Sequence, residues 1–226
     1  MSFVRSARRP ALLAAATVLA TALAAASAVV IAPTGASAAG STPSGTRSLA
    51  AVLTSDTGGF DRNSRDFDIL TRAVLTVLDA KPDSAVGVLT DGSVALTAFI
   101  PTDGAFRQLV RDITDARWLP SERRAFDAVA GLGVDTVESV LLYHVVPGAT
   151  IDSRTALRSD GAKLTTALGA TIEVDVRRWG HGCARLRLID ADRDDRDPRG
   201  AAFDINRGNR QIAHAIDRVL RPIDLP

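Results

Sequence analysis

Apolar residues recur at helical spacing in several stretches of the first half of the chain. The clearest stripe lies within residues 69–78, where apolar side chains fall three or four positions apart and so share one face. Similar patterns predict helices over residues 105–113 and 121–130, and a shorter one over 49–53. Between them, the apolar run from Val94 to Ile100 predicts a short buried strand.

Polar residues beside these stripes predict where the helices begin and end. Asp66 or Asp68 is expected to cap the helix over 69–78, and Pro82 to end it. The sequence Asp135-Thr136-Val137-Glu138 has the form of a capping box. It predicts a further helix that continues to Tyr143-His144.

In the second half of the chain the period changes to two, as expected for strands with one buried face. Apolar and charged residues alternate over 172–176 and again over 185–188, and the residues 179–182 between them suit a hairpin. Residues 190–200 predict a solvated loop of mixed charge, and 211–220 a last strand. Helices followed by strands favour an α+β domain over alternating βαβ units.

The N-terminus has the pattern of an export signal. Arg5, Arg8 and Arg9 precede an uncharged apolar run over 11–31, and the small residues Ala36-Ser37-Ala38 follow it. We therefore predict a signal peptide over 1–38, cleaved after Ala38. A retained membrane anchor is the alternative, because the 21 apolar residues are long enough to cross a bilayer about 30 Å thick. Two adjacent arginines also permit a twin-arginine export route.

Composition narrows the class of protein. After the predicted cleavage a flexible linker is expected over 39–48 and a single domain over 49–226. The 27 basic and 26 acidic residues of the whole chain become 24 and 26, a net charge of −2, once the three signal arginines leave. Such a balance lacks the basic surface of a nucleic-acid binder. Cys183 is the single cysteine, so no internal disulfide can form. We expect it to be partly buried, with an intermolecular disulfide that joins two chains as the alternative.

Three segments, in order, carry a resemblance to a known family. They are T-A-F-I-P-T-D-G-A-F over 97–106, L-L-Y-H-V-V-P-G over 141–148, and N-R-Q-I-A-H-A-I-D-R-V-L-R-P over 209–222. Together they resemble the signatures of the fasciclin domain family, and Leu164-Thr165 falls where that family has a Leu-Thr pair. The chain departs from the family pattern at Arg210-Gln211, which stands where a single Gly is usual, and in longer loops over 117–120 and 190–206.

The resemblance implies a fold and a role. The fold is a wedge-shaped β-sandwich of two sheets with helices packed on one side. The role is that of a secreted or cell-envelope-associated, non-enzymatic binding or adhesion module of bacterial type, with a protein or glycan as its partner. No cofactor, no metal, no nucleic acid and no membrane span after signal cleavage are expected.

The residues of the three segments have expected parts to play. Tyr143 and His144 are the candidate binding residues, because the Tyr-His segment has been treated as an adhesion determinant in animal relatives; we nevertheless expect His144 to be structural. Six residues are assigned to the structural motif: Pro101, Thr102, Asp103, Phe106, His214 and Asp217. Thr102 and Asp103 suit a helix start, and each buried imidazole should find a hydrogen-bond partner.

The sequence contains none of the local motifs of hydrolases, zinc peptidases or nucleotide-binding proteins. A dispersed Ser-His-Asp triad stays open because three histidines are present, so a secreted hydrolase is one alternative function. A small-ligand carrier is another, and it requires a sizeable apolar cavity. Asp190, Asp192 and Asp194 alternate like calcium-loop ligands, but Asp195 and Ala201 occupy positions that need Gly and Glu.

Overall fold

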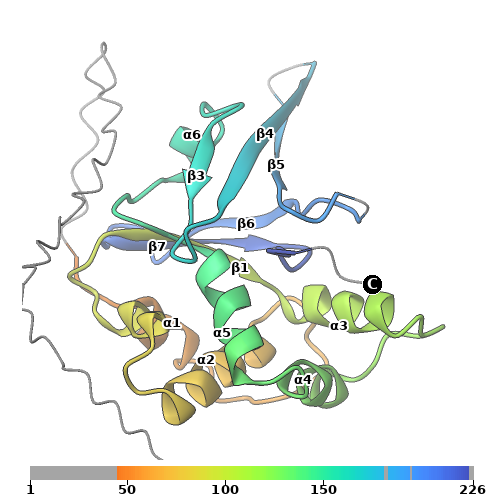
Figure 1. Cartoon of the computed structure of the whole chain (residues 1–226). Coiled ribbons are helices and arrows are strands. Elements are labelled where there is room, and N and C mark those ends of the chain that lie inside the picture. The colour runs from red at the N-terminus through yellow and green to blue at the C-terminus, as the bar shows by residue number, and fades with distance from the viewer. Residues whose placement is uncertain (1–44, 181–182, 194, 224–226) are drawn as a thin grey trace, which may run out of the picture. The chain divides into compact units, whose positions relative to one another are not determined.

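The fold is built from two β-sheets and a layer of helices that lies against the larger sheet. The computed structural model describes residues 45–180, 183–193 and 195–223 (Figure 1). The helices are α1 (Leu49–Leu53), α2 (Asp68–Ala80), the 3-10 helix η1 (Ala85–Thr90), α3 (Asp103–Ile113), α4 (Glu122–Ala130), α5 (Val134–Tyr143) and α6 (Ser153–Ala156). The strands are β1 (Leu96–Pro101), β2 (Val145–Pro147), β3 (Lys163–Thr165), β4 (Thr171–Trp179), β5 (Cys183–Ile189), β6 (Gly200–Ile205) and β7 (Gln211–Ile216).

The larger sheet has the strand order β2-β1-β7-β6. Its two central strands, β1 and β7, run parallel although more than a hundred residues separate them, while the outer pairs are antiparallel. Every residue of β1 and β7 is buried, because one face of this sheet meets the helices and the other meets the second sheet. The sheet therefore joins two of the three family-like segments, 97–106 and 209–222, side by side.

The smaller sheet has the order β3-β4-β5 and is antiparallel. Its inward residues, including Ile172, Val174 and Leu186, pack with Phe99 of β1 and Ile216 of β7 in one apolar core. Most of its outward residues are charged, as the period of two predicted, and Trp179 is an exposed exception. The two sheets thus form a sandwich, and the α+β class with two sheets is confirmed.

Helices α1 to α5 cover the opposite face of the larger sheet (Figure 1). Their apolar stripes form a second core with residues of β1 and β7 such as Ala98 and Ala213. The helices predicted over 49–53, 69–78, 105–113 and 121–130 are all present. Long amphipathic stripes fix helices reliably because burial of one face supplies most of their stability.

Three local predictions are wrong. Neither Asp66 nor Asp68 is the N-cap of α2; that residue is Phe67, which makes no side-chain hydrogen bond to the helix. Helix α5 begins after Gly133, whose φ is +88°, and has no capping box. Glu138 instead binds Lys81 and Ser84. The last strand ends at Ile216, because Asp217 turns the chain by bonding Arg199.

The start of the described chain lies against the turn before β7. Gly45 forms a parallel bridge with Asn209, and the backbone N–H of Arg47 donates to the Asn209 side chain at 2.9 Å. Ser48 then caps α1. Gly45, Arg47 and Ser48, which belong to the segment assigned to a linker, therefore have ordered contacts in the domain.

Candidate functional site

The Tyr143-His144 segment lies in the interior, where α5 ends and β2 begins. Tyr143 is fully buried, and its hydroxyl donates to the carbonyl of Thr171 at 3.1 Å. Burial raises the pKa of this hydroxyl to about 12. The ring belongs to the core between the two sheets, so Tyr143 connects α5 to the smaller sheet.

Both ring nitrogens of His144 are occupied. Nδ1 lies 2.7 Å from the carbonyl of Val140, one helical turn earlier, and Nε2 accepts from the backbone N–H of Leu220 at 2.9 Å. A ring that donates through Nδ1 and accepts through Nε2 is neutral, and burial lowers the pKa of His144 to about 4. This geometry is that of a structural histidine, since neither nitrogen is available to a substrate.

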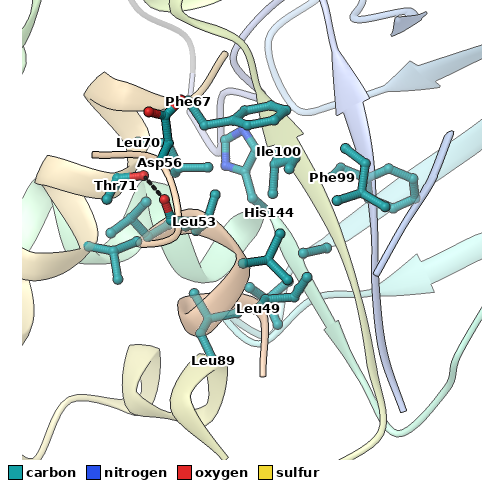
Figure 2. A pocket seen from close by; sticks show the side chains of 16 residues that line it. Leu49, Leu53, Asp56, Phe67, Leu70, Thr71, Leu89, Phe99, Ile100 and His144 are labelled. Carbon is teal, nitrogen blue, oxygen red and sulfur yellow. Dashed lines mark hydrogen bonds between the residues drawn. The ribbon is translucent and has the colours of Figure 1, made fainter. Parts of the chain in front are cut away.

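A small apolar cavity borders His144 (Figure 2). Its volume is about 70 Å³, room for a few water molecules, and apolar side chains such as Leu53, Phe67 and Ile100 surround the ring. The hydroxyl of Thr71 lies at its edge and donates to the carbonyl of Leu53. No serine or cysteine is among the described residues that line the cavity. The one hydroxyl among these described lining residues, that of Thr71, is engaged with the carbonyl of Leu53.

His214 has the same character. Its Nε2 lies 2.8 Å from the carbonyl of Ile151, and its Nδ1 accepts from the backbone N–H of Asp204 at 3.2 Å. The rings of Phe99 and Phe203 lie 5.9 and 5.5 Å from it. Because Nδ1 accepts the hydrogen bond from Asp204, the ring of His214 is neutral, and burial lowers its pKa. His181, the third histidine of the chain, lies outside the described residues.

The Pro-Thr-Asp segment organises two helices rather than one. Thr102 caps α3 as predicted, by accepting from the N–H of Ala105 at 3.3 Å. Asp103 is fully buried and accepts from the N–H groups of Asp68 and Ile69 at 3.2 and 2.9 Å, so it caps α2 from outside that helix. Burial raises its pKa to about 8. A single-sequence pattern could not have found this cap, because 34 residues separate the partners.

The other residues of the motif have structural contacts as well. Pro101 ends β1 opposite Ile216, and Phe106 is buried in the helical core. Asp217 accepts from the N–H of Arg199 at 2.7 Å and returns its own N–H to the carbonyl of that residue. This reciprocal pair closes the end of the β6–β7 hairpin, which agrees with the expected role of Asp217 as an acceptor of backbone amides.

The segment after β5 is only partly solvated, because buried carboxylates lie between its exposed residues. Asp190 and Asp192 are buried, and Arg221, itself 5% exposed, donates its backbone N–H to Asp190 at 2.8 Å and its guanidinium to Asp192 at 3.0 Å. Burial raises the pKa of Asp190 to about 7. The sequence did not reveal these buried carboxylates because the arginine that binds them comes from the far end of the chain. Asp194 lies outside the described residues.

The outward face of β4 and β5 carries a group of arginines around an exposed tryptophan. Arg177 lies directly opposite Arg185 across the two strands, and Trp179 opposite Cys183. The guanidinium of Arg185 lies over the Trp179 ring, 5.4 Å from its centre. A hollow of about 260 Å³ is lined by Arg177, Trp179, Arg185, Arg187 and Arg199. We call these five residues the arginine face.

Acidic neighbours balance only part of this charge. Arg177 and Arg187 both pair with Asp175, at 3.0 and 2.7 Å, and Arg187 also pairs with Asp197. In the part of the chain that the structure describes, no carboxylate lies within ion-pair distance of Arg185 or Arg199. The sequence signal for this face was the alternation of charged residues along both strands, but only strand pairing places Arg177 beside Arg185.

Comparison with known proteins gives a match that includes the same three segments. A family model of the fasciclin domain matches residues 75–222. The chain belongs to the fasciclin domain family. This match includes all three segments on which the resemblance rested, and the family is associated with cell adhesion.

A structure search finds a FAS1 domain pair from the insect cell adhesion molecule Fasciclin I. The two chains are 16% identical with a TM-score of 0.42, and the match covers 66% of this chain and 44% of the insect chain. This fasciclin domain therefore spans less than half of that protein. A search of curated protein sequences gave no match.

Fasciclin domains are generally non-catalytic modules of extracellular or surface proteins. None of the helices within the described residues has the length and apolar character needed to span a bilayer.

One departure from the family pattern has a clear consequence here. Gln211 is fully buried, accepts from the N–H of Leu49 at 2.7 Å and donates to the carbonyls of Val88 and Asp91, so it anchors α1 and η1 on β7.

Proposed function

We propose that this fasciclin domain is an exported, non-enzymatic binding module that recognises an anionic glycan of the cell envelope or extracellular matrix. The observation that carries the proposal is the arginine face on β4 and β5, with its exposed tryptophan. The export pattern of the N-terminus and the membership of an adhesion-associated family support the location and the general role.

The charge arrangement favours an anionic partner. Like charges directly opposite each other on neighbouring strands destabilise a sheet, and Arg177 and Arg185 have that relation. A bound sulfate, phosphate or carboxylate would relieve the repulsion, and guanidinium groups bind such groups in a bidentate manner. The cost of the arrangement in the free protein is thus recovered when an anion binds.

The tryptophan favours a sugar over a simple anion. Trp179 is 50% exposed, and its flat ring offers an apolar surface with Arg185 beside it. The apolar face of a pyranose ring packs well on such a surface, while acidic substituents of the sugar meet the arginines. A ring and several charges on one face therefore match an acidic polysaccharide.

Binding to a sulfated polysaccharide provides the test. Heparin immobilised on a sensor surface should bind the purified protein, with neutral dextran as the control ligand, and the affinity should fall as salt rises. Replacement of Arg185 and Arg199 by alanine should lower the affinity about tenfold or more. The variant Arg123→Ala changes an exposed arginine on α4 and should bind normally.

A second pair of variants tests whether heparin binding depends on Trp179 in particular or on any exposed tryptophan. Trp118 is 75% exposed and also lies beside an arginine, Arg117. Trp179→Ala should weaken heparin binding several-fold, and Trp118→Ala should leave it unchanged. Equal affinity of all variants would refute the glycan proposal, and retention of an acidic protein alone on the arginine face would favour a protein partner.

The two described histidines support a non-enzymatic role. Each has both ring nitrogens engaged with backbone groups, so neither can serve as a general base without loss of those bonds. If the protein were a secreted hydrolase, the native protein would turn over ester, peptide or glycoside substrates. We expect no such turnover.

An apolar groove favours a second candidate function, that of a small-ligand carrier. The groove has a volume of about 460 Å³ and lies between α3, α4, α5 and the C-terminal segment, with Phe106, Leu132, Leu168 and Ile223 among its lining residues. A volume of this size suits a drug-sized apolar molecule. Native mass spectrometry of protein purified without denaturation would reveal a ligand carried there.

A further inference from the structure

Five carboxylates meet on the helical side of the domain, where the loop before α2 contacts the starts of α3 and α4. Oxygen atoms of Asp61, Asp68 and Glu122 lie within 4.8 Å of one another, and so do oxygen atoms of Asp66, Asp68 and Asp103. Asp68 belongs to both groups. We call these five residues the carboxylate cluster.

The positions of the five residues are set by the backbone. The N–H of Asp61 donates to Oε2 of Glu122 at 2.7 Å, and the carbonyl of Asp66 accepts from the N–H of Asp103 at 3.0 Å. Asp103 in turn is held by the N–H groups of α2. The carboxylates are therefore brought together by the packing of α2, α3 and α4 and not by chance contacts of mobile side chains.

One member of the cluster has an unused oxygen in the protein interior. Glu122 is only 2% exposed, and its Oε1 is buried with no hydrogen-bond partner among the described residues. Asp66 has a buried oxygen, Oδ1, in the same condition. A buried charged oxygen without a partner is costly, so the interior lacks a positive group at this point.

A neighbouring cation, Arg107, is engaged with other groups. Arg107 on α3 donates its Nε to the carbonyl of Pro120 at 2.7 Å and its Nη1 to the hydroxyl of Ser64 at 2.6 Å. Within the described residues no arginine or lysine forms an ion pair with any member of the cluster.

We propose that the carboxylate cluster is a calcium site, with Asp61, Asp68 and Glu122 as its principal ligands. Calcium binds six to eight oxygen atoms at 2.3–2.6 Å. Oxygen atoms within 4.8 Å of one another can all lie at such a distance from one central ion. The unpartnered Oε1 of Glu122 would gain the calcium ion as its partner. Water would complete the coordination on the side of Asp61, which is exposed.

Calcium at this position would hold the loop before α2 against the start of α4. The affinity expected for an extracellular calcium module lies in the range of about 10⁻⁴–10⁻³ M. Because the ion binds the folded chain and not the unfolded one, it should stabilise the protein in proportion to its concentration.

Thermal unfolding and titration calorimetry with CaCl₂ alone would test the site. The chelator-treated full chain should show heat of binding, and its Tm should rise by roughly 5–10 °C when calcium reaches a hundred times the Kd. Sodium chloride of equal ionic strength should produce no such rise.

Two variants give the site its sharpest test. Glu122→Gln should abolish the calcium-dependent rise in Tm while its Tm in chelator equals or exceeds that of the parent, because a repulsive charge has gone. Asp61→Asn, at an exposed position, should weaken calcium binding at least tenfold without loss of folding. Asp79→Asn makes the same change on the exposed side of α2 and should bind calcium normally. Absence of binding by the parent chain, or an unaltered calcium response in both cluster variants, would overturn the proposal.

Discussion

His144 accepts a hydrogen bond from the backbone N–H of Leu220 at 2.9 Å and so joins the end of α5 to the C-terminal segment, 76 residues away. The other ring nitrogen meets the carbonyl of Val140 on the same helix. One imidazole therefore fixes the relation between the central and the last of the family segments. Its part in the fold explains why a histidine occupies an apolar stretch.

Replacement of His144 should cost stability, not only binding. His144→Ala leaves a buried N–H and a buried carbonyl without partners and creates a cavity, so we expect a loss of about 3–5 kcal/mol in the free energy of unfolding. Urea denaturation measures this loss. A variant with full stability and weakened binding would show that the side chain is a binding residue instead.

The same side chain predicts a pH dependence. The pKa of His144 is about 4 in the folded state and about 6.5 in the unfolded chain. The neutral form favours folding, so its contribution is complete above pH 6.5 and is lost as pH falls from 6.5 towards 4. His144→Gln removes this titration, and the stability difference between parent and variant should shrink by about 2 kcal/mol from pH 7 to pH 4.5.

Buried carboxylates change the stability with pH in the opposite direction to His144. The parent and His144→Gln must therefore be compared at each pH. The pKa values of Asp103 and Asp190 are raised to about 8 and about 7 in the folded protein, so protonation of either carboxyl group stabilises the folded state. Their contribution is present at low pH and is lost as pH rises through those values. A difference between parent and His144→Gln that did not change with pH would contradict the assignment of a neutral His144.

Asp103 should matter more than its neighbour Thr102. Asp103→Ala removes the acceptor for two N–H groups of α2, which then remain unsatisfied inside the protein, and we expect a loss of about 2–4 kcal/mol. Thr102→Ala removes one cap of α3 and should cost about 1 kcal/mol. Chemical denaturation of both variants gives the order, and equal losses would contradict the external capping of α2.

Cys183 provides a probe of the arginine face. The prediction of partial burial was wrong: Cys183 is exposed at the start of β5, opposite Trp179. A thiol reagent should therefore label it in the native protein as fast as in denatured protein. The disulfide between two chains stays a prediction, and non-reducing electrophoresis of oxidised protein would reveal it.

A bulky label on Cys183 should also interfere with the proposed glycan. The thiol lies beside the tryptophan on which a sugar would pack, so maleimide–biotin labelling should lower heparin affinity several-fold. The Cys183→Ser protein, treated with the same reagent but unable to react with it, is the control. Unchanged affinity after complete labelling would place the glycan away from Trp179.

The sequence by itself determined the features that depend on neighbours within a few positions. Its periodicity predicted four helices and the alternating strands β4 and β5, since an amphipathic pattern repeats over one or two turns. The Thr102 cap needs a partner only three residues away. The three family segments likewise identified the fasciclin domain, because each is a continuous stretch of chain.

Only the tertiary structure decided which distant residues meet. Asp103 caps a helix that begins 35 residues before it, Arg221 neutralises Asp192 from near the end of the chain, and Glu122 joins carboxylates from two other segments. Strand pairing likewise gathers arginines of β4 and β5 on one face. Such contacts arise when apolar faces pack and carry their polar neighbours along, so no local pattern records them.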